Sequence, residues 1–133
     1  MELSAMLKLL KEYFHRLPDV RMVFLFGSAA RERLGPESDI DIAVQFHKIP
    51  DAFELQNLKA DLADLLKREV DLISLNQASP ILRMQVLKNG ILVFVTDQRL
   101  YSEFFTDTIN QYDDLKRVRR ASEEGILRGR IYD

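Results

Sequence analysis

The chain has 133 residues, of which 47% are hydrophobic and 30% are charged, and its formal net charge is −2. This composition excludes a wholly disordered protein, and the length is enough for one domain with a buried core, so we expect a single domain over residues 1–133. The charge gives the chain no general basic field that would attract nucleic acid, so no direct nucleic-acid partner is expected.

The chain contains no cysteine, which excludes disulfides and thiolate metal sites. Four charged residues, Glu2, Lys8, Lys11 and Glu12, interrupt the N-terminal stretch, so it lacks the apolar core of a signal peptide. No apolar run reaches the length of a membrane span. We therefore expect a cytoplasmic protein without a membrane partner.

The first third of the chain predicts one helix and two strands. Apolar residues at three- and four-residue spacing indicate a helix over residues 3–16, which Pro18 ends. The apolar run at 21–26 predicts a strand in a covered, central position of a sheet. A second strand over 39–44 follows, in which two aspartates alternate with isoleucine and valine.

The remaining elements alternate between helix and strand. Asp51 is expected to cap a helix whose apolar face runs from Phe53 to Leu66. Ser79 and Pro80 are typical of a helix start, and Asn89-Gly90 of a helix end. The other expected elements are strands at 70–73 and 91–95 and a helix from 98 to about 124. This order predicts an α/β (α+β) fold, a small mixed sheet of about four strands flanked by helices.

A Gly27-Ser28 turn follows the first strand. Glycine lets the backbone turn sharply and approach a ligand closely, and the N–H groups of such a turn, with the Ser28 hydroxyl, form a phosphate cradle. An isolated Gly-Ser is also typical of an ordinary strand-to-helix turn. Arg31 lies shortly after the turn and could neutralise a triphosphate, as could Arg33, although a surface salt bridge explains Arg33 equally well.

Asp39 and Asp41 lie ten residues after Ser28, two positions apart on the second strand, so their side chains share a face. Two carboxylates about 5 Å apart repel each other by about 3 kcal/mol at an effective dielectric constant near 20. A cation between them would remove that repulsion, and hard oxygen ligands on a rigid strand suit Mg²⁺. Acids on an exposed strand face are also common without any function.

Asp71 lies within an apolar strand, between Val70 and Leu72. If this strand lies beside Asp41, Asp71 completes a cluster of three carboxylates, which suits metal-dependent phosphoryl transfer and a general base for an attacking hydroxyl. The alternative is a strand residue that simply faces solvent. The pattern alone does not decide between the two interpretations.

The combination of Gly-Ser, ten residues and then Asp-x-Asp resembles the signature of the DNA polymerase β-like nucleotidyltransferase superfamily. Within it, the chain resembles the minimal nucleotidyltransferases (MNT), which are the antitoxins of HEPN–MNT toxin–antitoxin pairs. The similarity continues through VDLISLNQASPILRMQVLKNGILVF and covers about residues 20–120. Two departures, Ala29 and Glu32, concern the connector after the turn and leave the carboxylates intact.

The resemblance implies a polymerase β-like fold and site. It assigns Gly27 and Ser28 to the nucleotide phosphates, and Asp39, Asp41 and Asp71 to catalysis and to Mg²⁺. The implied reaction transfers AMP from ATP to a tyrosine hydroxyl of a cognate HEPN ribonuclease toxin, which neutralises the toxin. Two alternatives remain open, an antitoxin that only binds the toxin and a nucleotidyltransferase that acts on a small molecule.

The segment 98–133, a helix followed by a basic tail, is the expected surface for a protein partner. Its aromatic residues include Tyr101, Phe104, Phe105 and Tyr112. Residues 115–133 hold six lysines and arginines against three acids. The alternative is a solvated helix end with a frayed terminus.

Overall fold

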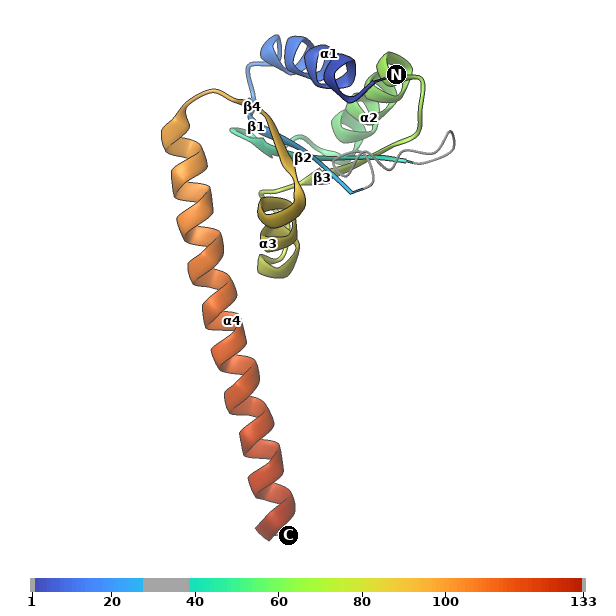
Figure 1. Ribbon diagram of the computed structural model, residues 1–133. Helices are drawn as coiled ribbons and strands as arrows, with labels where there is room; N and C mark the ends of the chain where they lie inside the picture. The colour runs from blue at the N-terminus through green and yellow to red at the C-terminus, as the bar shows by residue number, and fades with distance from the viewer. Residues whose placement is uncertain (1, 28–38, 133) are drawn as a thin grey trace.

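The computed structural model describes residues 2–27 and 39–132, and in this part of the chain the elements follow the predicted order (Figure 1). The elements are α1 (Leu3–His15), β1 (Val20–Phe26), β2 (Ile40–Phe46), α2 (Ala52–Leu66), β3 (Val70–Ser74), α3 (Pro80–Asn89), β4 (Ile91–Val95) and α4 (Gln98–Tyr132). The predicted fold class is therefore confirmed, and most boundaries agree with the expected ones to within a residue or two.

The four strands form one mixed sheet in the order β3-β2-β1-β4. β1 pairs antiparallel with both β2 and β4, whereas β2 and β3 run parallel. The central position that the apolar run of β1 predicted is confirmed, since Met22, Val23, Phe24 and Leu25 are all buried. The end of β1 consequently lies beside the start of β2, and β2 beside β3.

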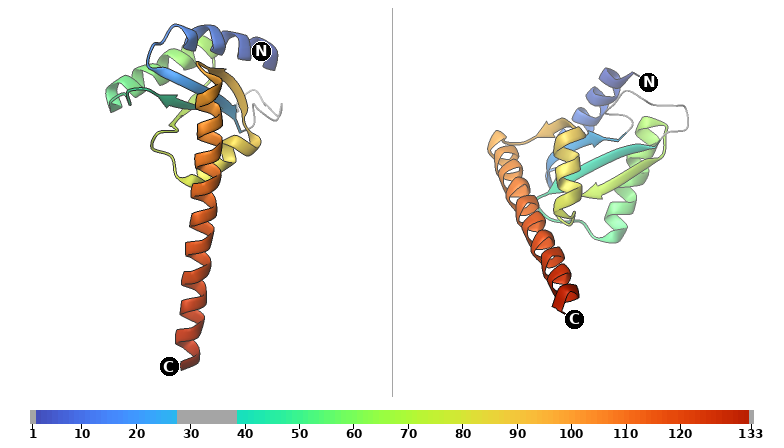
Figure 2. Two further views of the ribbon diagram at one scale, coloured as in Figure 1. Left: turned by 90° about the vertical axis from the view of Figure 1, so that its left-hand side faces the viewer. Right: turned by 60° about the horizontal axis from the view of Figure 1, so that its bottom comes forward.

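Helices cover both faces of the sheet (Figures 1 and 2). On one face, α1 and α2 pack against alternate residues of the strands, among them Ile40, Ile42 and Val70. On the other face, α3 and the first part of α4 enclose a smaller core that includes Phe24 and Ala43. Since residues of β2 alternate between these faces, burying the isoleucines directs the intervening aspartates toward the α3 side.

Two predicted helix starts are confirmed by their capping bonds. Asp51 Oδ1 accepts a hydrogen bond of 2.7 Å from the Glu54 N–H, and Ser79 Oγ accepts one of 3.2 Å from the Leu82 N–H. The predicted place of Phe53 on the apolar face of α2 is wrong, because its side chain is 74% exposed. It lies in the first turn of α2, before the helix packs against the sheet.

The C-terminal helix is longer than expected. It continues through Gly125 to Tyr132 and projects beyond the rest of the molecule (Figure 1). Its first part is anchored, because Phe104 and Thr108 are buried. Arg83 supports this anchor, since its guanidinium lies 5.8 Å from the centre of the Phe104 ring. Despite its length, no helix in the described ranges is apolar enough to cross a membrane.

Asn76 joins the loop after β3 to the end of β2. Its side-chain Oδ1 accepts a hydrogen bond of 2.8 Å from the Phe46 N–H, and its Nδ2 donates one of 2.9 Å to the Phe46 carbonyl. Asn76→Ala removes both partners from half-buried backbone groups, so we expect a loss of about 1–3 kcal/mol in the free energy of unfolding. Urea denaturation measures this loss. The exposed Asn57→Ala is the control, and equal stability of the two variants would contradict the assigned role.

Candidate active site

The site begins at the turn after β1. Gly27 has a φ of +72°, in the left-handed region that favours glycine. A Cβ atom at this position would overlap Oδ2 of Asp41. Asp41 is the register partner of Phe26, the residue before Gly27. The turn therefore lies close to the Asp41 carboxylate, and this contact depends on the missing side chain of Gly27.

Asp39 and Asp41 lie at the start of β2, as their alternation with isoleucine predicted. Asp39 immediately precedes the strand and is exposed, and Asp41 is half-buried on the α3 side of the sheet. Ile40 and Ile42 are fully buried on the opposite face. The burial of these isoleucines fixes the direction in which the aspartates point.

Asp71 lies beside Asp41. The two residues are register partners in the parallel pair of β2 and β3, where neighbouring strands lie about 4.8 Å apart. The sequence predicted that Asp71 completes the carboxylate cluster if its strand lies beside Asp41, and β3 does lie beside it. Asp71 is exposed, so it also faces solvent, as the alternative interpretation held.

The carboxylates influence one another electrostatically. The pKa of Asp41 is raised, chiefly by burial and then by the negative charges of Asp71 and Asp39. Each of these effects disfavours the ionised form of Asp41. A cation bound between the carboxylates would reverse the effect of the neighbouring charges, so the field at Asp41 suits a metal ion.

The donor set fits Mg²⁺ in chemical type, since Asp39, Asp41 and Asp71 all offer hard carboxylate oxygens. Within the ranges 2–27 and 39–132, however, no three histidine, cysteine or acidic side chains already form a group that could hold a metal ion. Asp39 and Asp71 are exposed, so packing within the described residues does not fix their side chains. Gathering the ligands therefore requires a side-chain movement.

Two predicted site residues, Ser28 and Arg31, lie outside the described residues, as does Arg33. Their contribution to phosphate binding stays a prediction. Ser28 directly follows Gly27 in the sequence and Arg31 lies four positions after it, and the Gly27 backbone lies against Asp41.

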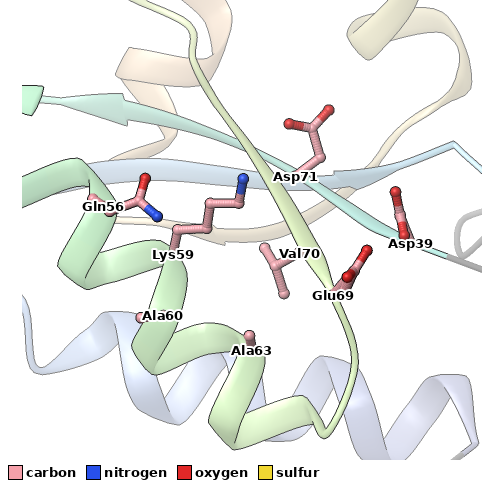
Figure 3. Close-up of a pocket in the computed structure, with 8 residues that line it drawn as sticks. All are labelled: Asp39, Gln56, Lys59, Ala60, Ala63, Glu69, Val70 and Asp71. Carbon is pink, nitrogen blue, oxygen red and sulfur yellow. The ribbon is translucent and has the colours of Figure 1, made fainter.

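Sequence reasoning missed a cavity of about 390 Å³ between β3 and α2 (Figure 3). Its lining comprises Asp39, Gln56, Lys59, Ala60, Ala63, Glu69, Val70 and Asp71. Glu69 had a detectable signal, because Glu69-Val70-Asp71 repeats the acid–apolar–acid pattern at 39–41. Lys59 had none, since a lysine on an amphipathic helix normally indicates a solvated face.

A sharp glycine turn and carboxylates on adjacent strands, on a mixed sheet covered by helices, suit metal-assisted nucleotidyl transfer. A family model described as "Polymerase beta, Nucleotidyltransferase" matches residues 8–99. The chain therefore belongs to the polymerase β nucleotidyltransferase family, as the signature in the sequence indicated.

Similar proteins extend this result over nearly the whole chain. The protein adenylyltransferase MntA of Shewanella oneidensis is 32% identical over 125 residues, which are 93% of this chain and 86% of that protein. The protein adenylyltransferase MntA of Thermococcus cleftensis is 33% identical over 91 residues, 68% of this chain and 88% of that protein.

Solved structures agree with the sequence relatives. A chain in the crystal structure of a toxin–antitoxin with AMP-PNP matches with a TM-score of 0.77 and 31% identity, covering 96% of this chain and 99% of that one. The tri-AMPylated Shewanella oneidensis HEPN toxin in complex with MNT antitoxin provides a match with a TM-score of 0.70 and 30% identity, over 94% and 95% of the two chains.

The raised pKa of Asp41 predicts the stability of Asp41→Asn. The folded chain binds a proton at Asp41 more tightly than the unfolded chain, so wild-type stability falls as pH rises from the ordinary pKa through the raised one. In metal-free buffer near neutral pH, Asp41→Asn should therefore have a higher Tm than wild type. The difference should shrink on acidification, because both side chains are then neutral.

Thermal unfolding over a pH series, in the presence of a chelator, measures this difference. The exposed Asp64→Asn on α2 is the matched control and should show a smaller change. A variant less stable than wild type near neutral pH would contradict the destabilisation that burial and neighbouring charges impose on ionised Asp41.

Gly27→Ala tests the close approach of the turn to Asp41. The left-handed backbone should cost about 1–2 kcal/mol of stability with any Cβ-bearing residue. The added Cβ also displaces the Asp41 carboxylate, so nucleotidyl transfer should fall by more than the stability loss explains. The control is Asn76→Ala, which loses stability away from the site and should retain transfer. Wild-type activity in Gly27→Ala would disprove the functional importance of this contact.

Proposed function

We propose that this chain is a Mg²⁺-dependent protein adenylyltransferase that transfers AMP from ATP to a tyrosine hydroxyl of a cognate HEPN ribonuclease toxin, and so acts as its antitoxin. The observation that carries the proposal is the register pairing of Asp41 with Asp71 beside the Gly27 turn. The relatives support the substrate class, because proteins similar to this chain over almost its full length are protein adenylyltransferases and toxin partners.

Each residue of the site has a role in this reaction. The backbone at Gly27, with Ser28 and Arg31, holds the triphosphate, because amide N–H groups and a guanidinium match phosphate oxygens. Asp39 and Asp41, together with Asp71, would hold Mg²⁺. When bound, Mg²⁺ supplies charge neutralisation and orientation of the triphosphate.

Asp71 also serves as the general base. It accepts the proton of the tyrosine hydroxyl as the phenolic oxygen forms a bond to the α-phosphorus of ATP. The bond between the α-phosphorus and the bridging oxygen to the β-phosphate breaks, and pyrophosphate leaves with that electron pair. Asp71 is exposed, so the proton can then pass to solvent. ATP and Mg²⁺ are both available in the cytoplasm, where we place the reaction.

The chain as a whole, residues 1–133, is proposed to be a single nucleotidyltransferase domain, with segment 98–133 contacting the partner. α4 projects beyond the sheet, and Val118 on it is 66% exposed (Figure 1). Four basic residues surround Val118: Lys116, Arg117, Arg119 and Arg120, all exposed. An exposed apolar residue within a basic band suits a protein surface that carries acidic groups. Tight binding through α4 can accompany transfer, and it is the alternative mode of neutralisation.

Intact-mass spectrometry of the partner tests the proposed reaction. The purified chain, Mg²⁺-ATP and a HEPN-type protein encoded beside it should give a partner that gains one or more AMP groups. Asp39→Ala and Asp41→Ala should each lower the rate by more than about 100-fold while leaving the fold intact, because each removes a metal ligand. The matched control is Asp64→Ala, an exposed acid on α2 outside the cavity.

Near-wild-type transfer by either site variant would contradict the metal assignment. Stable co-elution with the partner without any mass gain would indicate that the chain neutralises the partner by binding and not by transfer. If the partner shows no mass gain and does not co-elute with the chain, the proposed protein acceptor is disproved.

A further inference from the structure

The cavity between β3 and α2 has a defined place relative to the reacting groups. Successive strands place the Gly27 turn at the end of β1, Asp41 on β2 and Asp71 on β3. The cavity follows next, because β3 is the outer strand on this side and α2 packs beside it (Figure 3). Asp71 therefore stands between the phosphate turn and the cavity.

Nucleotidyl transfer requires that the attacking and leaving oxygens lie on opposite sides of the phosphorus atom. If the triphosphate lies at the Gly27 turn, pyrophosphate leaves on the β1 side of the site. The attacking hydroxyl must then approach from the β3 side. The cavity of about 390 Å³ opens on that side and includes Asp71, the proposed base, in its lining.

The lining is divided by polarity in a way that suits an amphipathic side chain. Ala60, Ala63 and Val70 provide small apolar surfaces from α2 and β3. Lys59 and Gln56 provide polar groups on α2, and Figure 3 shows the Lys59 side chain extending from the helix toward the strand that carries Asp71. A tyrosine combines an apolar ring with a polar tip, and the volume accommodates it together with part of a neighbouring residue.

Lys59 is the only lysine or arginine among the described residues that line the cavity, and three carboxylates share that lining with it. Within the described ranges Lys59 makes no ion pair with these acids. Among the described residues, nothing therefore competes with a ligand for its ammonium group by ion pairing. An ammonium beside a phenol stabilises the phenolate form, which is the nucleophile that transfer requires.

We propose that this cavity is the acceptor subsite, in which the ring of the acceptor tyrosine rests on Ala60 and Ala63 and Lys59 stabilises the phenolic oxygen. The subsite rests on the proposed protein adenylyltransferase function and names the residues that select its acceptor. In the reaction, the phenolic oxygen bonds to the α-phosphorus of ATP, its proton passes to Asp71, and pyrophosphate leaves. Lys59 supplies positive charge to the oxygen and exchanges no proton.

The test measures transfer kinetics with the full chain, Mg²⁺-ATP and the HEPN-type acceptor. Lys59→Met should lower kcat/KM for the acceptor by at least about 10-fold, and Lys59→Arg should restore most of it, since only charge is needed. Ala60→Leu should raise the acceptor KM, because it fills the cavity from an exposed helix position. Both effects should leave the affinity for Mg²⁺-ATP within about twofold of wild type.

Matched controls are Lys88→Met on α3 and Ala52→Leu on α2, both exposed and outside the cavity. Wild-type kinetics toward the acceptor in Lys59→Met or in Ala60→Leu would overturn the subsite. Loss of Mg²⁺-ATP affinity in both variants would also overturn it, by assigning the cavity to the nucleotide. If wild type itself transfers no AMP to the protein, the proposed function fails. If wild type and the variants are equally active, only the subsite fails.

Discussion

The repulsion between Asp41 and Asp71 is the constraint on which this structure depends. Two carboxylates occupy neighbouring positions of adjacent strands, and the pKa of Asp41 is raised, first by burial and then by the charges of Asp71 and Asp39. Nothing in their own interaction holds them together. Their neighbours do so, because Ile40, Ile42 and Val70 are buried against α1 and α2 on the other face of the sheet. Shifting β2 by one residue would expose these apolar side chains, so hydrophobic burial fixes the register of the acids.

On β2 and β3, these buried apolar side chains and the carboxylates Asp41 and Asp71 therefore face opposite sides of the sheet. The α1–α2 face contributes apolar burial, whereas the site lies at the ends of strands where the packing is open. Gly27 belongs to the same arrangement, since its missing Cβ leaves room for the Asp41 carboxylate. The carboxylates of such a site repel one another until substrate and metal bind. Apolar burial in the core offsets the destabilisation that this repulsion causes.

Local patterns predicted much of the fold. The caps at Asp51 and Ser79, the central position of β1 and the alternation at 39–42 depend on neighbours in the sequence, and the structure agrees with each. Features that depend on contacts between residues far apart in the sequence could not be predicted from local patterns. No local pattern revealed that Phe53 precedes the packed part of α2, or that Lys59 would face β3. The helical continuation through Gly125 was also unexpected, because glycine lowers helix propensity by about 1 kcal/mol without forbidding the helix.

The length of α4 has a consequence for repeated catalysis. Its 35 residues span about 50 Å at 1.5 Å per residue. If the partner contacts this helix as proposed, it stays tethered while its modified side chain leaves the site, and the next hydroxyl experiences a high effective concentration of enzyme. Successive transfers within one encounter become favourable, and substitutions along the helix can alter the residence time without altering the chemical step. Retention and turnover can therefore evolve separately in this protein.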